Sequence, residues 1–121
     1  MFRILVVEDD TNTRKLMAAV LTRYGYEPVT AGDGQEALAI LDKTHIDLIL
    51  LDVMMPKLDG FSTIMKVREK RNIPILVMSA KSEDSDKILG LSIGADDYIT
   101  KPFNYKEVVA RVKSQLRRYM R

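Results

Sequence analysis

Short apolar runs that end in a polar side chain alternate along this chain with segments of helical periodicity. The three clearest runs, each given with the residue that follows it, are 4–7 with Glu8, 48–51 with Asp52 and 75–78 with Ser79. An uninterrupted apolar run of this length is typical of a strand buried on both faces. Such strands belong to parallel sheets covered by helices on both sides, so the sequence predicts an α/β fold.

The whole pattern predicts five strands alternating with five helices. The predicted strands are 3–7, 27–31, 47–52 (with Asp47 opening the strand), 75–78 and 97–100. Thr11 or Asn12 is the expected cap of the first helix, which Gly25 ends. Parallel strands are joined by right-handed helical crossovers, and ligands of such sheets bind at the carboxyl ends of the strands.

Helical spacing also predicts which side chains face the core. The expected inward residues are Leu16, Met17, Val20, Leu21 and Tyr24 in the first helix, Ala37, Leu38 and Leu41 in the second (35–43), Phe61, Ile64, Met65 and Arg68 in the third, Ile88, Leu91 and Ala95 in the fourth (capped within 82–85), and Tyr105, Val108, Val109, Val112, Leu116 and Tyr119 in the fifth. Gly90 and Gly94 weaken the fourth helix, which is expected to be among the more mobile elements.

Composition bounds the class of protein. The 121 residues, 46% hydrophobic and 30% charged, suit one globular domain with a single core. No apolar run approaches the length of a membrane span, the amino terminus lacks the pattern of a signal peptide, and without cysteine there is no disulfide framework or thiolate metal site. These features favour a cytoplasmic protein.

Charge is divided unevenly along the chain. Residues 1–60 carry 6 Lys and Arg against 10 Asp and Glu, a net charge of −4, and residues 61–121 carry 13 against 7, a net charge of +6. We interpret this as an acidic site in the first half and solvated basic helix faces in the second. Direct nucleic-acid binding is the weaker interpretation, because the basic residues are not interleaved with stacking aromatics.

Polar side chains from four strand ends are predicted to meet at one edge of the sheet. They are Glu8, Asp9, Asp10, Asp52, Ser79 and Lys101. Oxygen ligands completed by water suit Mg²⁺, whereas zinc would have no cysteine ligand and only the lone His45. We interpret His45, in a helix-to-strand connection, as a surface loop residue.

A carboxylate beside a divalent cation, a lysine and a hydroxyl can attack a phosphoryl group. The cation and the lysine would neutralise the phosphoryl oxygens, the serine hydroxyl would hydrogen-bond one of them, and the product would be an acyl phosphate on Asp52. Each residue alone has an ordinary explanation: Asp9 or Asp10 as a helix cap, Ser79 as a turn residue, Lys101 as a solvated cation. Their shared position at one sheet edge favours the functional interpretation.

Four motifs cover this predicted site. They are 4–10 (ILVVEDD), 51–56 (LDVMMP) with Asp59 and Gly60, 79–80 (SA), and 94–103 (GADDYITKPF). With them the chain resembles, over essentially all of residues 1–121, the receiver domain of two-component response regulators, most of all the OmpR/PhoB-like subfamily that carries winged-helix DNA-binding domains. The resemblance implies a flavodoxin-like, doubly wound (βα)5 sandwich with a parallel sheet of order 2-1-3-4-5 and helices on both faces.

The resemblance also implies roles for the site residues. The implied ligands of Mg²⁺, for which Mn²⁺ can substitute, are Glu8 (through water), Asp9, Asp52 and the backbone carbonyl of Met54. Asp52 would accept the phosphoryl group of a sensor histidine kinase, and Ser79 and Lys101 would contact it; no role follows for Asp10. Such a receiver is a switch rather than an enzyme in the usual sense, since it catalyses only its own phosphorylation and dephosphorylation.

The family's switch would consist of Ser79, whose hydroxyl moves toward the phosphoryl group, and Tyr98, whose ring then packs inward. Threonine is commoner than serine at the first position, but serine keeps the hydroxyl. The family also has a cis peptide before the proline that matches Pro102.

The subfamily dimerises through the fourth helix, fifth strand and fifth helix. The charged residues expected on that face are Lys87, Asp96, Asp97, Glu107, Arg111 and Arg118. The expected pairs are Lys87 with Glu107 and Asp97 with Arg111, which would set register more than affinity. A solvated helix face is the alternative.

Two further hypotheses concern Met54 and Lys81 and the end of the chain. Neither the Met54 side chain nor the Lys81 side chain is suited to orienting a water that attacks the acyl phosphate, so slow self-dephosphorylation is expected. The basic ending 117–121 is favourable at a helix carboxyl terminus and predicts that the natural protein continues into a DNA-binding domain. A stand-alone receiver that acts through protein contacts is the alternative.

Two other classes fit less well. An aspartyl-phosphate hydrolase normally needs a second carboxylate two residues after the nucleophile, where this chain has Met54. A flavodoxin-like cofactor binder needs a hydroxyl- and glycine-rich phosphate loop after the first strand, and the acidic residues 8–10 would repel a phosphate without a metal ion.

Overall fold

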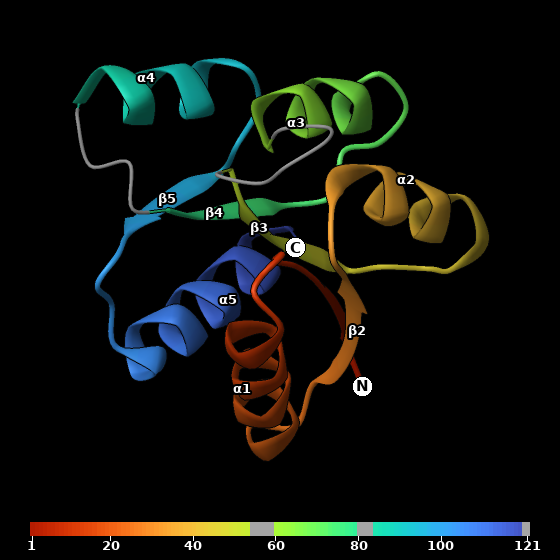
Figure 1. Ribbon diagram of the computed structural model, residues 1–121, viewed down its shortest axis with the longest axis vertical. Coiled ribbons are helices and arrows are strands. Elements are labelled where there is room, and N and C mark those ends of the chain that lie inside the picture. Colours follow the sequence, from red (N-terminus) through yellow and green to blue (C-terminus); the bar gives the residue numbers. More distant parts are fainter. Residues whose placement is uncertain (54–59, 80–83, 120–121) are drawn as a thin grey trace.

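The computed structural model describes residues 1–53, 60–79 and 84–119, in which strands and helices alternate (Figure 1). The strands are β1 (Arg3–Val7), β2 (Glu27–Ala31), β3 (Leu48–Asp52), β4 (Ile75–Ser79) and β5 (Asp97–Thr100). The helices are α1 (Thr11–Arg23), α2 (Gly34–Lys43), α3 (Gly60–Arg68), α4 (Asp84–Ser92) and α5 (Tyr105–Tyr119). None of the helices in these ranges is long and apolar enough to cross a membrane.

The five strands form one parallel sheet of order β2-β1-β3-β4-β5, which confirms the predicted topology. The strand order changes direction between β1 and β3, the place where open α/β sheets bind ligands. The register keeps the carboxyl ends level, since Asp52 pairs with Met78 and Ser79 pairs with Thr100.

Two apolar layers separate the sheet from its helices, because successive strand residues point to opposite faces. Leu5, Val7, Ile49 and Leu51 join the layer beneath α2 and α3, to which Ala95 and Tyr98 also belong. The residues that alternate with them, such as Val6 and Leu50, join the layer beneath α1 and α5. In Figure 1 α2, α3 and α4 lie on one side of the sheet and α1 and α5 on the other.

The predicted strands agree with the structure except at two ends. β4 extends to Ser79, and β3 begins at Leu48 rather than at Asp47. The Asp47 carboxylate instead accepts a hydrogen bond from the Arg3 backbone amide at 2.8 Å and lies 2.8 Å from His45 Nε2. His45 is a highly exposed residue of the connection before β3, as predicted.

Some of the predicted inward residues are exposed in four helices, although others that were predicted there, such as Met17, Leu21 and Ile64, are buried. In α1, Leu16 and Tyr24 are exposed and only Met17 and Leu21 are buried. In α3 the buried side chains include Thr63 and Val67, whereas Met65 is 57% exposed. In α4, Ile88 is 63% exposed and Leu91 is exposed too, because the helix presents Gly90 to the domain. In α5, Tyr119 is also exposed.

The cap of α1 differs from the prediction of Thr11 or Asn12. The helix begins at Thr11, and the carboxylate of the preceding residue, Asp10, accepts a hydrogen bond from the Thr13 backbone amide at 2.8 Å. A carboxylate satisfies the free amides of the first turn and interacts favourably with the helix dipole. This role directs the Asp10 side chain toward α1.

Candidate functional site

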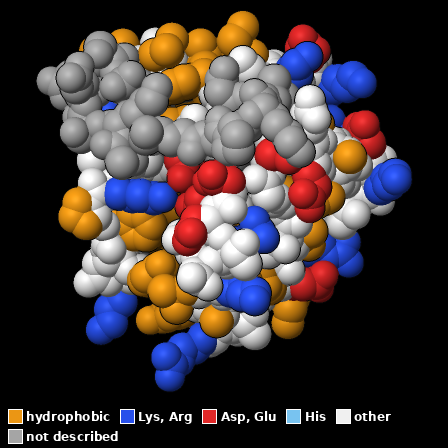
Figure 2. Space-filling view, in the orientation of Figure 1, with side chains coloured by type: hydrophobic (Ala, Val, Ile, Leu, Met, Phe, Trp, Pro, Cys, Tyr) orange, Lys and Arg blue, Asp and Glu red, His pale blue; other side chains and the backbone are white. Residues whose placement is uncertain are grey.

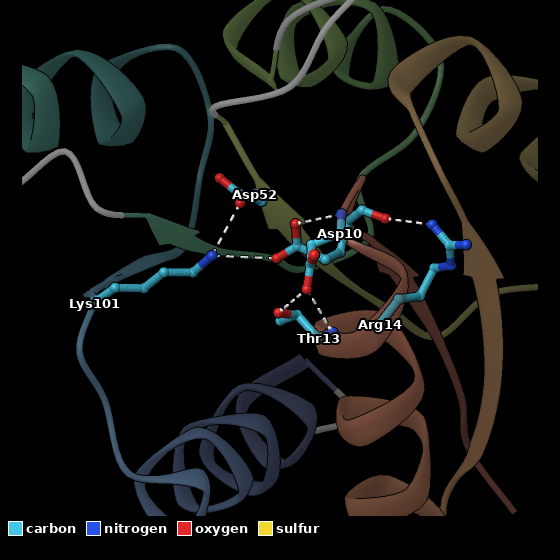
Figure 3. Close-up of polar contacts among 6 residues, drawn as sticks. Asp10, Thr13, Arg14, Asp52 and Lys101 are labelled. Atoms are coloured by element: carbon cyan, nitrogen blue, oxygen red, sulfur yellow. Dashed lines mark hydrogen bonds and ion pairs between the residues drawn. The ribbon is translucent and has the colours of Figure 1, made fainter.

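The carboxyl ends of four neighbouring strands bring the predicted site residues to one edge of the sheet. Glu8 follows β1, Asp52 ends β3, Ser79 ends β4 and Lys101 follows β5. Although β3 and β4 lie between β1 and β5, the long Lys101 side chain comes within 3.2 Å of Glu8, a residue 93 positions away in the sequence. Figure 3 shows Asp52 and Lys101 converging from different strands.

Three carboxylates meet at this edge. One oxygen each from Glu8, Asp9 and Asp52 lies within 4.8 Å of the others. Glu8 is 2% and Asp52 4% exposed, whereas Asp9 faces solvent. A group of acidic side chains is visible near the middle of the face in Figure 2. Like charges this close repel one another unless a cation is present, and an all-oxygen cluster partly open to water is the kind that binds Mg²⁺.

Lys101 supplies a cation from the protein itself. Its Nζ lies 3.0 Å from Asp52 Oδ2 and 3.2 Å from Glu8 Oε1, so one ammonium group bridges two nearly buried carboxylates. Burial alone would lower the pKa of Lys101, but the hydrogen bond to Asp52 and the charges of Asp52 and Glu8 raise it overall. The ammonium group therefore stays charged at this edge. The Lys101–Pro102 peptide bond is cis, as the resemblance implied.

Glu8 is the carboxyl group whose charge the fold disfavours. Burial raises the pKa of Glu8, and the negative charge of Asp52 raises it further. The hydrogen bond from the Asp10 amide to Glu8 Oε2, 3.2 Å long, and the charge of Lys101 offset part of this rise. A cation bound beside Glu8 would favour the carboxylate form in the same way as Lys101 does.

Asp10 is adjacent to the cluster in sequence but serves the helix. Hydrogen bonds from the Thr13 hydroxyl and the Thr13 amide lower the pKa of the Asp10 carboxyl group. Figure 3 shows the two bonds to Thr13. Asp10 is therefore a helix cap, which is the ordinary explanation that the sequence offered for Asp9 or Asp10.

Arg14 is a polar neighbour of the site that sequence reasoning missed. Its Nη1 donates a hydrogen bond of 2.8 Å to the backbone carbonyl of Glu8 (Figure 3). The available signal was spacing: Arg14 follows Asp10 by four positions, so the first turn of a helix capped by Asp10 carries it back toward the strand end.

Ser79 and Tyr98 occupy neighbouring strands. Ser79 is fully buried, and its carbonyl accepts a 2.7 Å hydrogen bond from the Lys101 amide. The Tyr98 ring packs into the core and lies against Gly90, where a Cβ atom would be 3.2 Å from two ring carbons. The ring is thus directed inward. Met54 and Lys81, on which slow dephosphorylation was predicted, lie outside the described residues.

The charged residues predicted on the α4-β5-α5 face fall into separate groups. Arg111 Nη1 lies 2.7 and 2.9 Å from the two Asp97 oxygens, and Arg111 Nη2 lies 3.2 Å from Glu107 Oε2. Asp96 instead pairs with Arg68 of α3 at 2.8 Å. The two remaining predicted residues are Lys87, which is half-buried, and Arg118, which is exposed and shares a shallow hollow with Asp96.

Sequence comparisons identify relatives of the chain. The model of the response regulator receiver domain family matches residues 4–113. Regulatory protein VanRc of Enterococcus gallinarum is 50% identical over 119 residues, which are 98% of this chain and 52% of VanRc. Alkaline phosphatase synthesis transcriptional regulatory protein PhoP of Bacillus subtilis is 50% identical over 117 residues, 96% of this chain and 49% of PhoP. The chain spans about half the length of these curated relatives.

Solved structures agree with the sequence comparisons. The receiver domain of the Francisella response regulator 1452 superposes with a TM-score of 0.94 at 35% identity, covering 98% of this chain and 99% of that one. Response regulator TrrA of Thermotoga maritima, solved in complex with Mg(2+)-BeF, gives a TM-score of 0.86 at 35% identity, covering 95% and 99%. The family match, these relatives and the shared sheet topology show that the chain belongs to the response regulator receiver domain family and is a receiver domain of a two-component response regulator.

Proposed function

We propose that Asp52 is the phosphoacceptor of this receiver and that a sensor histidine kinase is the donor. The observation that carries the proposal is the bridge formed by Lys101, whose Nζ lies 3.0 Å from Asp52 within a cluster of three carboxylates. A lysine in this position is poised to neutralise the oxygens of a group attached to Asp52. Asp52 is also the only one of the three carboxylates that ends a central strand of the sheet.

The transfer follows from these positions. An Asp52 carboxylate oxygen attacks phosphorus, the bond from phosphorus to the imidazole nitrogen of the kinase's phosphohistidine breaks, and that nitrogen keeps the electron pair. The Lys101 ammonium group neutralises the phosphoryl oxygens as the phosphoryl group is transferred to Asp52. The Ser79 hydroxyl donates a hydrogen bond to one of these oxygens. The only chemistry proposed for this domain is its own phosphorylation and dephosphorylation. Dephosphorylation is proposed to be slow, because neither Met54 nor Lys81 is suited to orienting an attacking water.

The same residues suit the metal ion that the family uses. We assign Glu8, Asp9 and Asp52 to Mg²⁺, with Mn²⁺ as a substitute, because their oxygens converge within 4.8 Å and no softer donor is among them. The ion would supply positive charge to the transferring group. The complex of TrrA with Mg(2+)-BeF supports this assignment. The Met54 carbonyl, the remaining proposed ligand, lies outside the described residues.

Phosphorylation is proposed to act through Ser79 and Tyr98 on the α4-β5-α5 face, which would then form a symmetric dimer. Because PhoP is a transcriptional regulatory protein of about twice this length, we further propose that a DNA-binding domain follows residue 121 in the natural protein, which would act in the cytoplasm. A stand-alone receiver that signals by protein contacts remains the alternative.

The test is intact mass measurement after incubation with acetyl phosphate and Mg²⁺. We expect one phosphoryl adduct per chain, lost in EDTA and in Asp52→Ala. Asp42→Ala, which removes an exposed carboxylate of α2, is the matched control and should keep the adduct. Absence of a stoichiometric adduct on the unaltered chain, or an undiminished adduct on Asp52→Ala, would falsify the proposal.

A further inference from the structure

The segment Glu8 to Asp10 is held by hydrogen bonds from three sides. The Glu8 amide donates to the Ala31 carbonyl of β2 at 3.0 Å, the Asp10 amide donates to Glu8 Oε2 at 3.2 Å, and Arg14 Nη1 donates to the Glu8 carbonyl at 2.8 Å. Of these three contacts, only the one from Arg14 is donated by a cationic side chain, and Figure 3 shows this side chain reaching back from α1 to the strand end. Hydrogen bonds from charged donors are stronger than those between neutral groups.

The partner of Arg14 distinguishes it from Lys101. Among the described residues Arg14 forms no ion pair with a carboxylate, although three carboxylates converge one helical turn away. A guanidinium group paired with Glu8 or Asp9 would compete with a metal ion for that carboxylate. Bound to the Glu8 carbonyl, it fixes the backbone that carries both residues and leaves their side chains available.

The end of β2 provides the space for this contact. A Cβ atom at Gly32 would lie 3.3 Å from Arg14 Nη1 and 3.6 Å from Glu36 Oε2. The Glu36 carboxylate in turn accepts a 3.2 Å hydrogen bond from the Gly32 amide, which holds it beside the same notch. The absence of a side chain at residue 32 therefore lets the guanidinium group lie next to the strand end.

We propose that Arg14 is a positioning residue for the metal site: it holds the Glu8–Asp9 backbone so that both carboxylates converge with Asp52. This inference rests on the proposed function of the cluster. Arg14 touches neither the phosphoryl group nor the metal ion and acts through the Glu8 carbonyl.

The proposal makes a prediction opposite in sign to that of simple electrostatics. By Coulomb's law, removal of a positive charge beside three carboxylates strengthens the binding of a second cation. If positioning dominates, Arg14→Ala instead weakens Mg²⁺ binding, by about tenfold, as is typical when a partner that orients metal ligands is lost. The direction of the change therefore separates the two effects.

The experiment is a calorimetric titration of the chain with MgCl₂, combined with amide NMR spectra of residues 7–11. Lys15→Ala is the matched control, since Lys15 is the exposed neighbour of Arg14 on α1 and its removal changes the net charge equally. We expect the Mg²⁺ affinity of Lys15→Ala to be unchanged or slightly higher. Arg14→Lys, which keeps a charged donor, should recover part of the affinity lost in Arg14→Ala.

Gly32→Ala probes the same contact without removing the arginine. Its methyl group would lie 3.3 Å from Arg14 Nη1, so the guanidinium group must shift by a few tenths of an ångström. A smaller loss of Mg²⁺ affinity is therefore expected, with shifted amide resonances at Glu8 and Asp9. This variant keeps the test decisive if Arg14→Ala does not fold. The inference is overturned if Arg14→Ala binds Mg²⁺ as tightly as the unaltered chain or more tightly. If Arg14→Ala does not fold, the same result in Gly32→Ala overturns it. Failure of the unaltered chain to bind Mg²⁺ would instead count against the proposed function itself.

Discussion

Glu8 shows at the scale of one residue how a binding site conflicts with stability. The side chain is almost fully buried next to Asp52, and Lys101 lies between the two carboxylates. The pKa of Glu8 is still raised, by burial and by the charge of Asp52, so Lys101 offsets only part of these effects. Polar groups placed for function commonly cost folding stability, and their replacement commonly restores it. Glu8 should therefore be a residue whose charge the unfolded chain tolerates better than the folded one.

We predict that Glu8→Gln stabilises the metal-free chain at neutral pH by about 1 kcal/mol. Because burial and Asp52 raise the pKa of Glu8 above 4.5, the folded state binds this proton more tightly than the unfolded state. The contribution of Glu8 to stability is thus fully present below pH 4.5 and is lost as pH rises through the folded-state pKa. Glutamine does not titrate, so the advantage of the variant should grow with pH.

Urea denaturation in EDTA over a pH series measures this difference in the free energy of unfolding. Glu69→Gln, at an exposed position of the connection after α3, is the control and should differ little from the unaltered chain at any pH. A Glu8→Gln variant that is less stable than the unaltered chain at neutral pH would show that Lys101 overcompensates the burial of Glu8.

At the scale of elements, α3 approaches the end of β3 more closely than any side chain allows. A Cβ atom at Gly60 would lie 2.1 Å from Val53 Cα, and the Gly60 amide donates to the Val53 carbonyl at 3.2 Å. Val53 directly follows Asp52, so this contact also ties the first residue of α3 to the site. The residue at position 60 must therefore be glycine unless the backbone moves.

We predict that Gly60→Ala destabilises the chain by about 2 kcal/mol or more, because the backbone of Val53 must shift to admit the methyl group. Alanine's better helix propensity, worth about 1 kcal/mol, offsets only part of this cost. Gly90→Ala is the matched control within another helix: there the new Cβ would meet the Tyr98 ring at 3.2 Å, and a ring can move. Chemical denaturation of both variants should show a near-neutral Gly90→Ala; a Gly60→Ala variant as stable as the unaltered chain would contradict the prediction.

At the scale of the whole molecule, the α4-β5-α5 face is the surface on which the proposed dimer depends. Arg111 is already paired with Asp97 and Glu107 inside one chain, whereas the described part of the chain shows no partner for Lys87. The exposed apolar side chains Ile88 and Leu91 lie on the same helix as Lys87. A second copy of this face would cover these apolar groups and offer Glu107 to Lys87.

We predict that Lys87→Glu and Glu107→Lys each weaken dimerisation of the phosphorylated chain by about tenfold, since a symmetric dimer contains two copies of each altered pair. The double variant should recover much of the affinity, because the pair is restored with its charges exchanged. Sedimentation equilibrium with acetyl phosphate and Mg²⁺ measures the dissociation constant. Lys66→Glu on α3, away from this face, is the control. Single variants that dimerise as tightly as the unaltered chain would exclude this pair from the interface.

The sequence by itself determined the positions of the strands and the polar residues at their carboxyl ends. Uninterrupted apolar runs that end at the polar residues Glu8, Asp52 and Ser79 are typical of strands buried in a parallel sheet, and strands of that kind bring such residues to one edge. These features are local or follow from topology, so they can be predicted without coordinates.

Only the tertiary structure decided how the helices are turned and which groups meet. Periodicity states that apolar residues recur, but the rotation of a helix depends on what it packs against, which is why Met65 and Ile88 face solvent and Thr63 and Gly90 face inward. The capping role of Asp10 and the contact from Arg14 to the Glu8 carbonyl likewise depend on the angle at which α1 leaves β1. The same acidic run thus contains metal-site candidates and a helix cap, and its three residues differ because the chain turns between them.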